Sequence, residues 1–364
     1  MGIVYGEVKS FVTMGVPTVK TLEVTDITLQ SAKVIGMVAD DGGAAVMECG
    51  ICWSNTQTEP DIYGPHESAS GNPFTVEITS LEIGSYYYVR AYAINQFGIS
   101  YGNTITFLSV PSGVFSVSSN KKVYFSPGNL QYVGSSSNPY WKFAEHQWDY
   151  LGTSSNQNSN GQYVTRDLFG YGTSGHNNGQ TCYQPWSTSQ IQDDYYSGNL
   201  TGSADWGNNA IVNGGNQVGT WRTLTRNEWD YLLNVRSAST VNGYVNARFA
   251  KATVNGINGI ILFPDTYVHP DNAQLPTRIN ESSVSYSFNN YSASAWSLLE
   301  NSGAVFLPVT GIRSGTTVNG TYGYYWTASG STSGANRFFF SDYSLEIGSA
   351  QRQYGFAVRL VMPF

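Results

Sequence analysis

The chain has 364 residues, of which only 12% are charged, and its formal net charge is −7. This acidic balance argues against a nucleic-acid partner, which requires basic patches, and no stretch approaches the roughly eighteen apolar residues that a membrane span needs. Hydrophobic residues make up 41% of the sequence, which suffices for a sizeable core, and the length suits two or three domains.

The first fifteen residues contain a segment that is echoed later in the chain. The sequence "YGEVKSFVT" (5–13) is similar to "YGNTITFLS" (101–109), at an offset of 96 residues. This offset matches one β-sandwich domain of roughly 100 residues. We therefore predict that residues 1–15 are the last strand of a preceding repeat, or a linker, and that tandem domains of the same polypeptide lie upstream. The segment does not have the pattern of a signal peptide.

Residues 16–110 consist of short apolar runs separated by turn residues. The segments "SAKVIGMVAD", "VMECGICWS", "NPFTVEITSL" and "GSYYYVRAYAIN" alternate apolar and polar positions with period two. This pattern predicts an all-β sandwich of the immunoglobulin or fibronectin type. One face of its last long strand should carry Tyr87, Val89, Ala91 and Ala93. The region from "ICWSNTQTEP" to "YGNTITF" resembles fibronectin-like modules of Bacteroidetes surface proteins, and this resemblance implies a spacer.

The three cysteines are Cys49, Cys52 and Cys182. The spacing of "CGIC" fits a redox motif, but positions three apart on a strand point to opposite faces, so these two thiols should diverge. We expect two packed strand cysteines, a third that is unpaired, and no disulfide framework.

From residue 114 to residue 364 the composition changes, and long loops rich in Asn, Gly and Ser appear. One helix is predicted in "TLTRNEWDYLLNVR", where Thr225 and Glu228 form a capping box. A second helix is predicted from about Ser292 to Glu300. Strands are expected in "NGIILFPD", "GAVFLPVTG", "YYWTAS", "RFFFS" and "YGFAVRLV". The two helices, a small antiparallel sheet and many ordered loops predict an α+β domain.

Three ordered motifs in this second domain resemble a known family. "WRTLTRNEWDYLL", "YYWTAS" and "YGFAVRLV" are similar to motifs of the formylglycine-generating, or sulfatase-modifying-factor, type of the C-type lectin fold. The wider pattern, which includes "KVYFSPGNLQY" and "LPVTGIR", resembles a domain of Bacteroidetes and phage surface proteins. Some proteins of that group are variable proteins of diversity-generating retroelements. The resemblance implies a C-type lectin-like fold for residues 114–364.

The enzymatic members of this fold use metals, and their ligand patterns are absent here. The copper-dependent type uses a late pair of cysteines, whereas this chain has no cysteine after Cys182. The iron-dependent type uses an H-x-x-x-H-x-E arrangement that the four scattered histidines cannot form. His146, Asp149 and His176 could hold a metal, although hydrogen-bonded loop histidines are the favoured interpretation. We therefore expect no enzymatic activity and no catalytic residues.

The tripeptides with which C-type lectins bind calcium and sugar, E-P-N or Q-P-D together with W-N-D, do not occur in the chain. Loop residues such as Asp193, Asp194 and Asp205 could still bind a calcium ion in a structural role. Apart from such a calcium ion, we predict no cofactor.

Period-two alternation in "NRFFFSDY" predicts two faces for one strand. Phe338 and Phe340 should point into the core and pack beneath Trp326 and Phe356. The resemblance described above implies these scaffold positions: Trp326, Phe338, Phe340, Gly355, Phe356 and Val358. Four side chains should point outward: Arg337, Phe339, Ser341 and Tyr343. An exposed Phe and Tyr beside an Arg is the composition of an interface hot spot, and the alternative is that a long loop covers Phe339.

In similar retroelement proteins the variable, ligand-facing residues lie in this last stretch. The resemblance implies these candidate ligand-binding positions: Ser331, Thr332, Asn336, Arg337, Phe339, Ser341, Tyr343, Leu345, Arg352 and Gln353.

The sequence as a whole predicts a non-enzymatic ligand-binding protein of receptor or adhesin type. Its partner would be a protein or glycan on another cell or host surface, and its location extracellular, on a bacterial cell or a phage virion. Two alternatives remain at this point. One is a sulfatase-modifying-factor-like enzyme with an atypical metal site, and the other is a structural component of a fimbria or virion.

Overall fold

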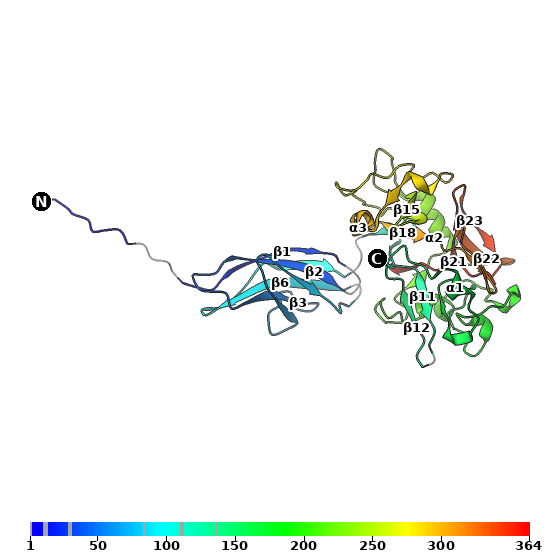
Figure 1. Ribbon diagram of the computed structural model, residues 1–364, viewed down its shortest axis with the longest axis horizontal. Helices are drawn as coiled ribbons and strands as arrows, with labels where there is room; N and C mark the ends of the chain where they lie inside the picture. The colour runs from blue at the N-terminus through cyan, green and yellow to red at the C-terminus, as the bar shows by residue number, and fades with distance from the viewer. Residues whose placement is uncertain (1, 10–13, 28–30, 83–84, 110–112, 136) are drawn as a thin grey trace. The chain divides into compact units, whose positions relative to one another are not determined.

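The computed structural model describes residues 2–9, 14–27, 31–82, 85–109, 113–135 and 137–364. The chain forms two compact units, Met1–Val110 and Pro111–Phe364 (Figure 1). No helix in the described part of the chain is long and apolar enough to cross a membrane.

The first unit is a β-sandwich, as the alternating pattern predicts. One sheet has the order β1-β2-β5, and the other has the order β4-β3-β6-β7, with β8 also paired to β6. The strands are β1 Thr18–Thr25, β2 Ala32–Asp40, β3 Glu48–Ser54, β4 His66–Ala69, β5 Phe74–Ile78, β6 Tyr86–Asn95, β7 Gly98–Tyr101 and β8 Ile105–Leu108. Both sheets contribute side chains to one apolar core, for example Val34 and Val76 from the first sheet and Ile51 and Val89 from the second.

The predicted alternation along β6 is confirmed, because its core-facing side chains are Tyr87, Val89, Ala91 and Ala93. The two strand cysteines also diverge as predicted. Cys49 belongs to the core between the sheets, whereas the Cys52 thiol donates to the Pro60 carbonyl at 3.3 Å. All three cysteines are free thiols.

Residues 2–9 form no regular strand, so the structure provides no sheet partner for the first part of the predicted N-terminal strand. Residues 10–13 of that prediction lie outside the described residues. The apolar side chains of Ile3, Val4, Tyr5 and Val8 are all at least 80% exposed.

The second unit contains short strands and long loops. The strands are β9 Phe115–Ser116, β10 Lys122–Phe125, β11 Leu130–Val133, β12 Tyr140–Phe143, β13 Thr165–Arg166, β14 Arg222–Thr223, β15 Phe249–Val254, β16 Ile257–Leu262, β17 Asn290–Tyr291, β18 Val305–Pro308, β19 Ile312–Ser314, β20 Thr317–Asn319, β21 Gly323–Ser331, β22 Gly334–Phe340, β23 Leu345–Ala350 and β24 Leu360–Pro363. They associate in the orders β14-β24-β10-β9, β12-β11-β13, β17-β15-β16-β18, β19-β20 and β21-β22-β23.

The helices of the second unit are α1 Gly152–Gln157, α2 Arg226–Asp230 and α3 Ala293–Asn301, and single turns are η1 Gly161–Tyr163, η2 Thr181–Tyr183, η3 Gln192–Asp194, η4 Gly202–Ala204, η5 Trp206–Asn208 and η7 Tyr286–Phe288. The predicted capping box of α2 is confirmed, because Thr225 and Glu228 each bond the backbone of the other. The predicted second helix is α3, with Ser292 as its N-cap.

The helix that starts with α2 does not end as an ordinary α-helix. It continues as the π-helical turn η6, Tyr231–Val235, in which the Arg236 N–H donates to the Tyr231 carbonyl. Two guanidinium groups satisfy carbonyls of this last turn. The Nε of Arg236 donates to the Leu232 carbonyl and the Nε of Arg248 donates to the Leu233 carbonyl, both at 2.8 Å. Cations are favourable at this end of a helix because they also oppose its dipole.

The closing segment "YGFAVRLV" is a regular strand only at its end, so the predicted strand is too long. Leu360–Pro363 form β24, whereas Gly355, Phe356 and Ala357 make isolated bridges to three different segments. The chain there crosses from one sheet to the next instead of following a single neighbour.

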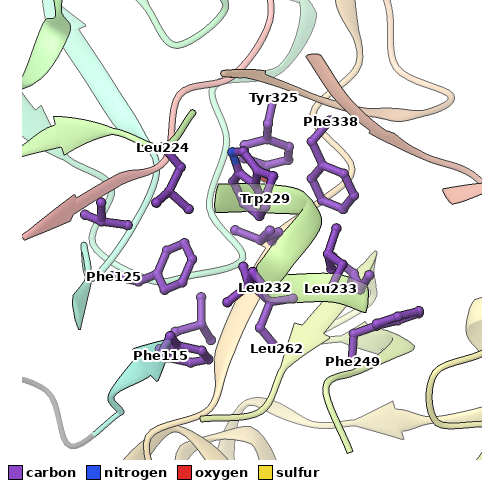
Figure 2. Close-up of a cluster of buried hydrophobic side chains, with 14 of the residues drawn as sticks. Phe115, Phe125, Leu224, Trp229, Leu232, Leu233, Phe249, Leu262, Tyr325 and Phe338 are labelled. Carbon is purple, nitrogen blue, oxygen red and sulfur yellow. The ribbon is translucent and has the colours of Figure 1, made fainter. Parts of the chain in front are cut away.

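The main core of the second unit surrounds Trp229, as Figure 2 shows. The Trp229 ring stacks on Phe338 with 4.8 Å between centroids and lies 6.0 Å from Phe125. Phe338 and Phe340 are fully buried, as predicted. Their predicted partners are wrong, however: Phe338 is opposite Tyr325 in the ladder, and Trp326 and Phe356 pack on the other face of the sheet.

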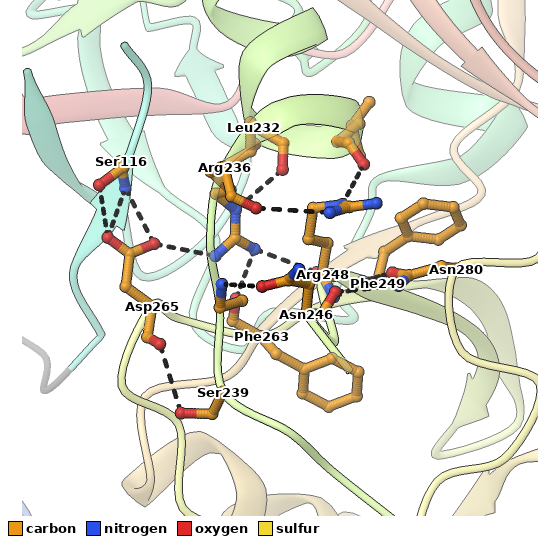
Figure 3. Close-up of polar contacts among 12 residues, drawn as sticks. Ser116, Leu232, Arg236, Ser239, Asn246, Arg248, Phe249, Phe263, Asp265 and Asn280 are labelled. Carbon is orange, nitrogen blue, oxygen red and sulfur yellow. Dashed lines mark hydrogen bonds and ion pairs between the residues drawn. The ribbon is translucent and has the colours of Figure 1, made fainter. Parts of the chain in front are cut away.

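A buried ion pair joins the end of the helix α2–η6 to the rest of the core (Figure 3). Arg236 is fully buried, and its Nη1 lies 2.9 Å from Oδ1 of Asp265. Asp265 also accepts hydrogen bonds from the N–H and the hydroxyl of Ser116. Burial lowers the pKa of Arg236 to about 10, against the effect of Asp265, so the guanidinium remains charged at neutral pH and depends on this carboxylate.

Candidate ligand-binding face

The register of the β21-β22-β23 sheet decides which side chains share its outer face. Tyr324, Phe339 and Glu346 lie opposite one another on the three strands. In the next row of the same face, Trp326 lies opposite Arg337, and Arg337 lies opposite Gly348. Directly opposed side chains on one face of a sheet are in contact distance. In Figure 1 these strands, drawn in red, lie beside α2, which contacts all three of them.

Aromatic rings form a continuous row across this face. Phe339 lies 4.9 Å from Tyr324 and 5.7 Å from Tyr322, measured between ring centroids. Tyr324 stacks in parallel on Phe356 at 4.8 Å, and Phe356 lies 6.2 Å from Tyr354. Such offset and edge-to-face pairs each contribute about 0.5–1.5 kcal/mol beyond the burial of their area. The row is therefore held rigidly although its outer rings are accessible to solvent.

Two buried rings on the same face of the sheet, Phe356 and Trp326, anchor this row. Phe356 is 1% exposed and lies 4.4 Å from Trp326, whose indole Nε1 donates to the Phe169 carbonyl at 2.7 Å. Tyr322 is 41% exposed, and Tyr324, Phe339 and Tyr354 are half-buried. The outer rings thus combine a fixed position with partial exposure.

Arg337 lies over the row and is held by two kinds of contact. Its guanidinium carbon is 4.8 Å from the centroid of Phe339 and 5.5 Å from that of Tyr324. Its Nη2 forms an ion pair with Oε1 of Glu346 at 2.9 Å. Its Nη1 has no hydrogen-bond partner among the described residues. We name the six residues Tyr322, Tyr324, Arg337, Phe339, Glu346 and Tyr354 the aromatic face.

The ten predicted ligand-binding positions divide into two groups. Ser331, Arg337, Phe339 and Leu345 are half-buried, and Thr332 and Tyr343 are exposed, Tyr343 by 83%. The buried positions are Asn336, Ser341, Arg352 and Gln353, each at most 9% exposed. The structure thus brings only Arg337 and Phe339 of the ten into the aromatic face.

The four buried positions are occupied with internal contacts, and the prediction that Ser341 points outward is wrong. The Asn336 amide donates to the carbonyls of Ser329 and Gly330 and accepts from Arg226. The Ser341 hydroxyl accepts from the Tyr343 N–H. Arg352 donates to the Tyr195 carbonyl. Gln353 donates to the Gln351 side-chain oxygen. All four side chains are thus engaged in contacts within the protein, and little of their surface is open to a ligand.

Leu345 is also turned inward, because it packs against the main core together with Ile347. Phe339 is partly covered, but by Tyr322 and Tyr324 rather than by a long loop.

Four residues of the aromatic face were not predicted: Tyr322, Tyr324, Glu346 and Tyr354. Tyr324 could have been found, because it lies two positions before Trp326 and so shares its face.

The histidines and the acid considered as metal ligands are in contact with neighbouring side chains. His146 Nδ1 lies 3.0 Å from Asp149 Oδ2, and its ring stacks on Trp148 at 4.6 Å. His176 packs between Tyr183 and Tyr196, and burial lowers its pKa. Within the described residues no group of three or more His, Cys, Asp or Glu side chains could hold a metal ion.

Two of the acids considered for calcium already accept hydrogen bonds from the protein. The buried Asp205 carboxylate accepts from the Gly207 N–H and from the N–H and hydroxyl of Thr223. Asp194 accepts from the Ser189 hydroxyl at 2.5 Å. Burial raises the pKa of Asp205, and these donors keep its buried oxygens satisfied.

The turn between β22 and β23, which carries Tyr343, is fastened to β15 by Lys251. This side chain is fully buried, and its Nζ donates to the carbonyls of Ser282, Ser341 and Ser344. Burial lowers the pKa of Lys251 to about 8, while the nearby Asp342 opposes this shift.

The buried Lys251 should make stability depend on pH. Its folded pKa is below the 10.5 of an ordinary lysine, so between pH 8 and 10.5 the unfolded chain binds more protons than the folded one. The unfavourable burial of the charge therefore acts fully below pH 8 and is relieved as the pH rises. Between pH 7 and 9.5, we expect the unfolding free energy of the wild type to rise by roughly 1–2 kcal/mol relative to Lys251→Met. Urea denaturation of the wild type and of Lys251→Met at pH 7 and at pH 9.5 measures this change. If the difference in unfolding free energy between the two proteins were the same at both pH values, the prediction would be wrong.

No family model matches the chain, and no curated protein matches it. Parts of the chain are similar to solved structures of immunoglobulin-like and fibronectin-like domains. Titin domains A168–A170 are 18% identical over 27% of this chain and 32% of that one, with a TM-score of 0.21. The sixth fibronectin type III domain of human fibronectin type III domain containing protein 3 is 21% identical over 30% and 92%, with a TM-score of 0.20.

The sensor domain of the anti-sigma factor RsgI4 from Pseudobacteroides cellulosolvens is 15% identical over 26% of this chain and 94% of that one, with a TM-score of 0.20. The chain spans about a third of the titin structure that it matches. It is a mostly β protein with an immunoglobulin- or fibronectin-like part.

Proposed function

We propose that this protein is a non-enzymatic binding protein whose ligand contacts the aromatic face. The observation that carries this proposal is the row of partly exposed rings on β21 and β22, with Arg337 over it and Glu346 beside it. Tyr and Arg are enriched at protein interfaces, and Tyr is among the residues that dominate their energetics. Rings whose positions are already fixed lose little conformational entropy when a ligand binds.

We further propose that the second unit is a C-type lectin-like domain of the sulfatase-modifying-factor type, and that the sandwich is a spacer that displays it. It rests on the three ordered sequence motifs, and on a helix with a capping box that packs against the terminal sheet. The ligand would be a protein or glycan on another cell or host, and the protein would be extracellular. We also propose that a retroelement diversifies the protein, and this part of the proposal rests only on the sequence resemblance.

We expect Phe339→Ala and Tyr324→Ala each to weaken ligand binding at least tenfold, which corresponds to about 1.4 kcal/mol. Glycan and protein arrays probed with the wild-type protein would first identify a ligand, and titration calorimetry would then compare the variants. Tyr63→Ala is the matched control, because Tyr63 is a 93% exposed aromatic residue of the first unit. Full binding by both face variants would exclude the aromatic face as the site.

The retroelement part of the proposal has a separate genomic test. A neighbouring reverse transcriptase gene, with a near-copy of the last part of the coding sequence that differs at adenines, is the expected result. Without such a copy, the protein would be a binding protein of fixed sequence.

A further inference from the structure

A groove of about 680 Å³ lies between the helix α2–η6 and the strand β23. One wall is the polar face of the helix, with Asn227, Asp230 and Asn234, all of which are exposed. On the β23 side the groove is lined by Leu345, Glu346 and Ile347, and the rest of its lining includes Arg248, Phe249, Asn280 and Ser282. The volume falls within the usual range of about 300–1,000 Å³ for binding pockets.

The β23 wall of this groove is a free sheet edge. β23 is the outermost strand of the β21-β22-β23 sheet. The Ser341 N–H donates to the Ser344 carbonyl at 2.9 Å, and in an antiparallel ladder such bonded pairs recur at every second residue. The pairs Phe339–Glu346 and Arg337–Gly348 therefore carry the ladder bonds. The backbone N–H and C=O groups of Leu345, Ile347 and Ser349 point away from β22.

These outward backbone groups have no partner among the described residues, since no hydrogen bond outside the ladder reaches the backbone of Leu345, Ile347 or Ser349. A row of unpaired N–H and C=O groups is a template for another strand. Pairing with an added peptide satisfies both sets of groups at once, whereas a sugar has no matching repeat of donors and acceptors. The chemistry of this edge thus favours an extended peptide.

The helix wall complements the far side of such a peptide. Asn234 donates to Asp230 at 2.9 Å, while the Asn227 side chain forms no hydrogen bond among the described residues and can pair with a peptide group. The charged residues that line the groove are Arg226, Arg248, Asp230 and Glu346, and their formal charges sum to zero, although Glu346 also forms the ion pair with Arg337 on the aromatic face. A peptide without net charge fits this lining.

We propose that this groove binds an extended, uncharged segment of a partner protein, which adds to β23 as a fourth strand of the sheet. The six residues of β23 would pair with a segment of about six residues, roughly 20 Å long. This second site does not depend on the aromatic face, although Glu346 borders both. It gives the terminal sheet one site on its outer face and another along its edge.

The test uses the full chain and a displayed library of uncharged heptapeptides rich in Val, Thr and Ser. We expect binders with a dissociation constant of at most about 1 mM. Hydrogen exchange of the Leu345, Ile347 and Ser349 amides should slow at least tenfold when a selected peptide binds, and that of Glu346 and Gly348 should not change. Slowing at neither set, or the absence of any binder, would overturn the proposal.

Two N-methylated forms of a selected peptide give the sharper control. One carries methyl groups on its odd-numbered amides and the other on its even-numbered amides, so strand addition predicts that only one form loses binding. Equal loss in both forms would indicate recognition by side chains alone and contradict the proposal.

Protein variants test the same edge. Ile347→Pro removes an outward N–H and should abolish binding, whereas Ile347→Val keeps it and should bind normally. Asn227→Ala, on the exposed helix wall, should weaken binding without a loss of stability. Phe339→Ala should leave peptide binding unchanged, which separates this site from the aromatic face. Concentration-dependent dimerisation without peptide, seen by ultracentrifugation, would instead assign the edge to a second copy of the chain.

Discussion

Trp229→Ala is expected to lower the free energy of unfolding of the second unit by about 3–5 kcal/mol, the usual range for removing a buried Trp or Phe ring. Trp229 is 1% exposed and contacts Phe338 and Phe125, so it joins the helix to both β22 and β10. A cavity at this position would remove packing contacts among α2, β22 and β10.

Urea denaturation followed by circular dichroism measures this effect, and the sandwich unit should keep its own transition. Trp229→Phe is the matched variant. The indole Nε1 has no hydrogen-bond partner among the described residues, so this change removes ring volume and no hydrogen bond, and should cost less than half as much. Tyr343→Ala, at an 83% exposed site, should change stability by at most about 0.5 kcal/mol. Equal costs for the alanine and phenylalanine variants would show that packing volume is not what matters at this position.

Asp265→Ala is expected to destabilise the second unit by about 3–5 kcal/mol, because it leaves the buried Arg236 without its carboxylate. The same change removes the acceptor of the Ser116 N–H and hydroxyl. The remaining partners of Arg236 are the carbonyls of Leu232, Arg248 and Phe263, which carry no formal charge to balance it.

A double-mutant cycle with Arg236→Met isolates the interaction between the two charges. The double variant should be more stable than the sum of the single changes predicts, because it removes the charge that Asp265→Ala strands. Glu281→Ala, in the exposed ion pair with Arg278, serves as the control and should cost at most about 1 kcal/mol. Additive effects of the two core variants would mean that the pair does not interact energetically.

Local patterns predicted the elements that depend on neighbours in sequence. The capping box at Thr225 and Glu228, the alternation along β6 and the burial of Phe338 and Phe340 all follow from spacing within one element. In the two strands, period-two alternation decides which side chains are buried, whereas the capping box depends on the three-residue spacing of Thr225 and Glu228.

The register of the terminal hairpin could not be predicted, because it depends on contacts distant in sequence. The pairing of β21 with β22 shifts by two residues between Trp326 and Gly330. At the shift, the Ala328 N–H donates to the Leu224 carbonyl, and the Ser329 hydroxyl accepts from the Arg226 N–H. These bonds draw residues of β21 toward the start of α2 and away from β22, and no pattern within the hairpin encodes them.

The same limit applies to the candidate site. Alternation within one strand selected Arg337 and Phe339 correctly as outward residues, but it could not show that Tyr322 and Tyr354 lie beside them. It also could not show that loops bury Arg352 and Gln353, because the burial of a loop side chain depends on which segments pack over it.

The position of β24 has a consequence for the way the protein is made. This strand lies between β10 and β14 in its sheet, yet it is formed by residues 360–363. Its pairing partners leave the ribosome more than 130 residues earlier and must wait with their edges unpaired. The sandwich, by contrast, can fold while synthesis continues, since domains generally fold as units from the N-terminus. We therefore expect the second unit to fold only after residue 363 has emerged, and nascent chains arrested before β24 to remain sensitive to proteases throughout this unit.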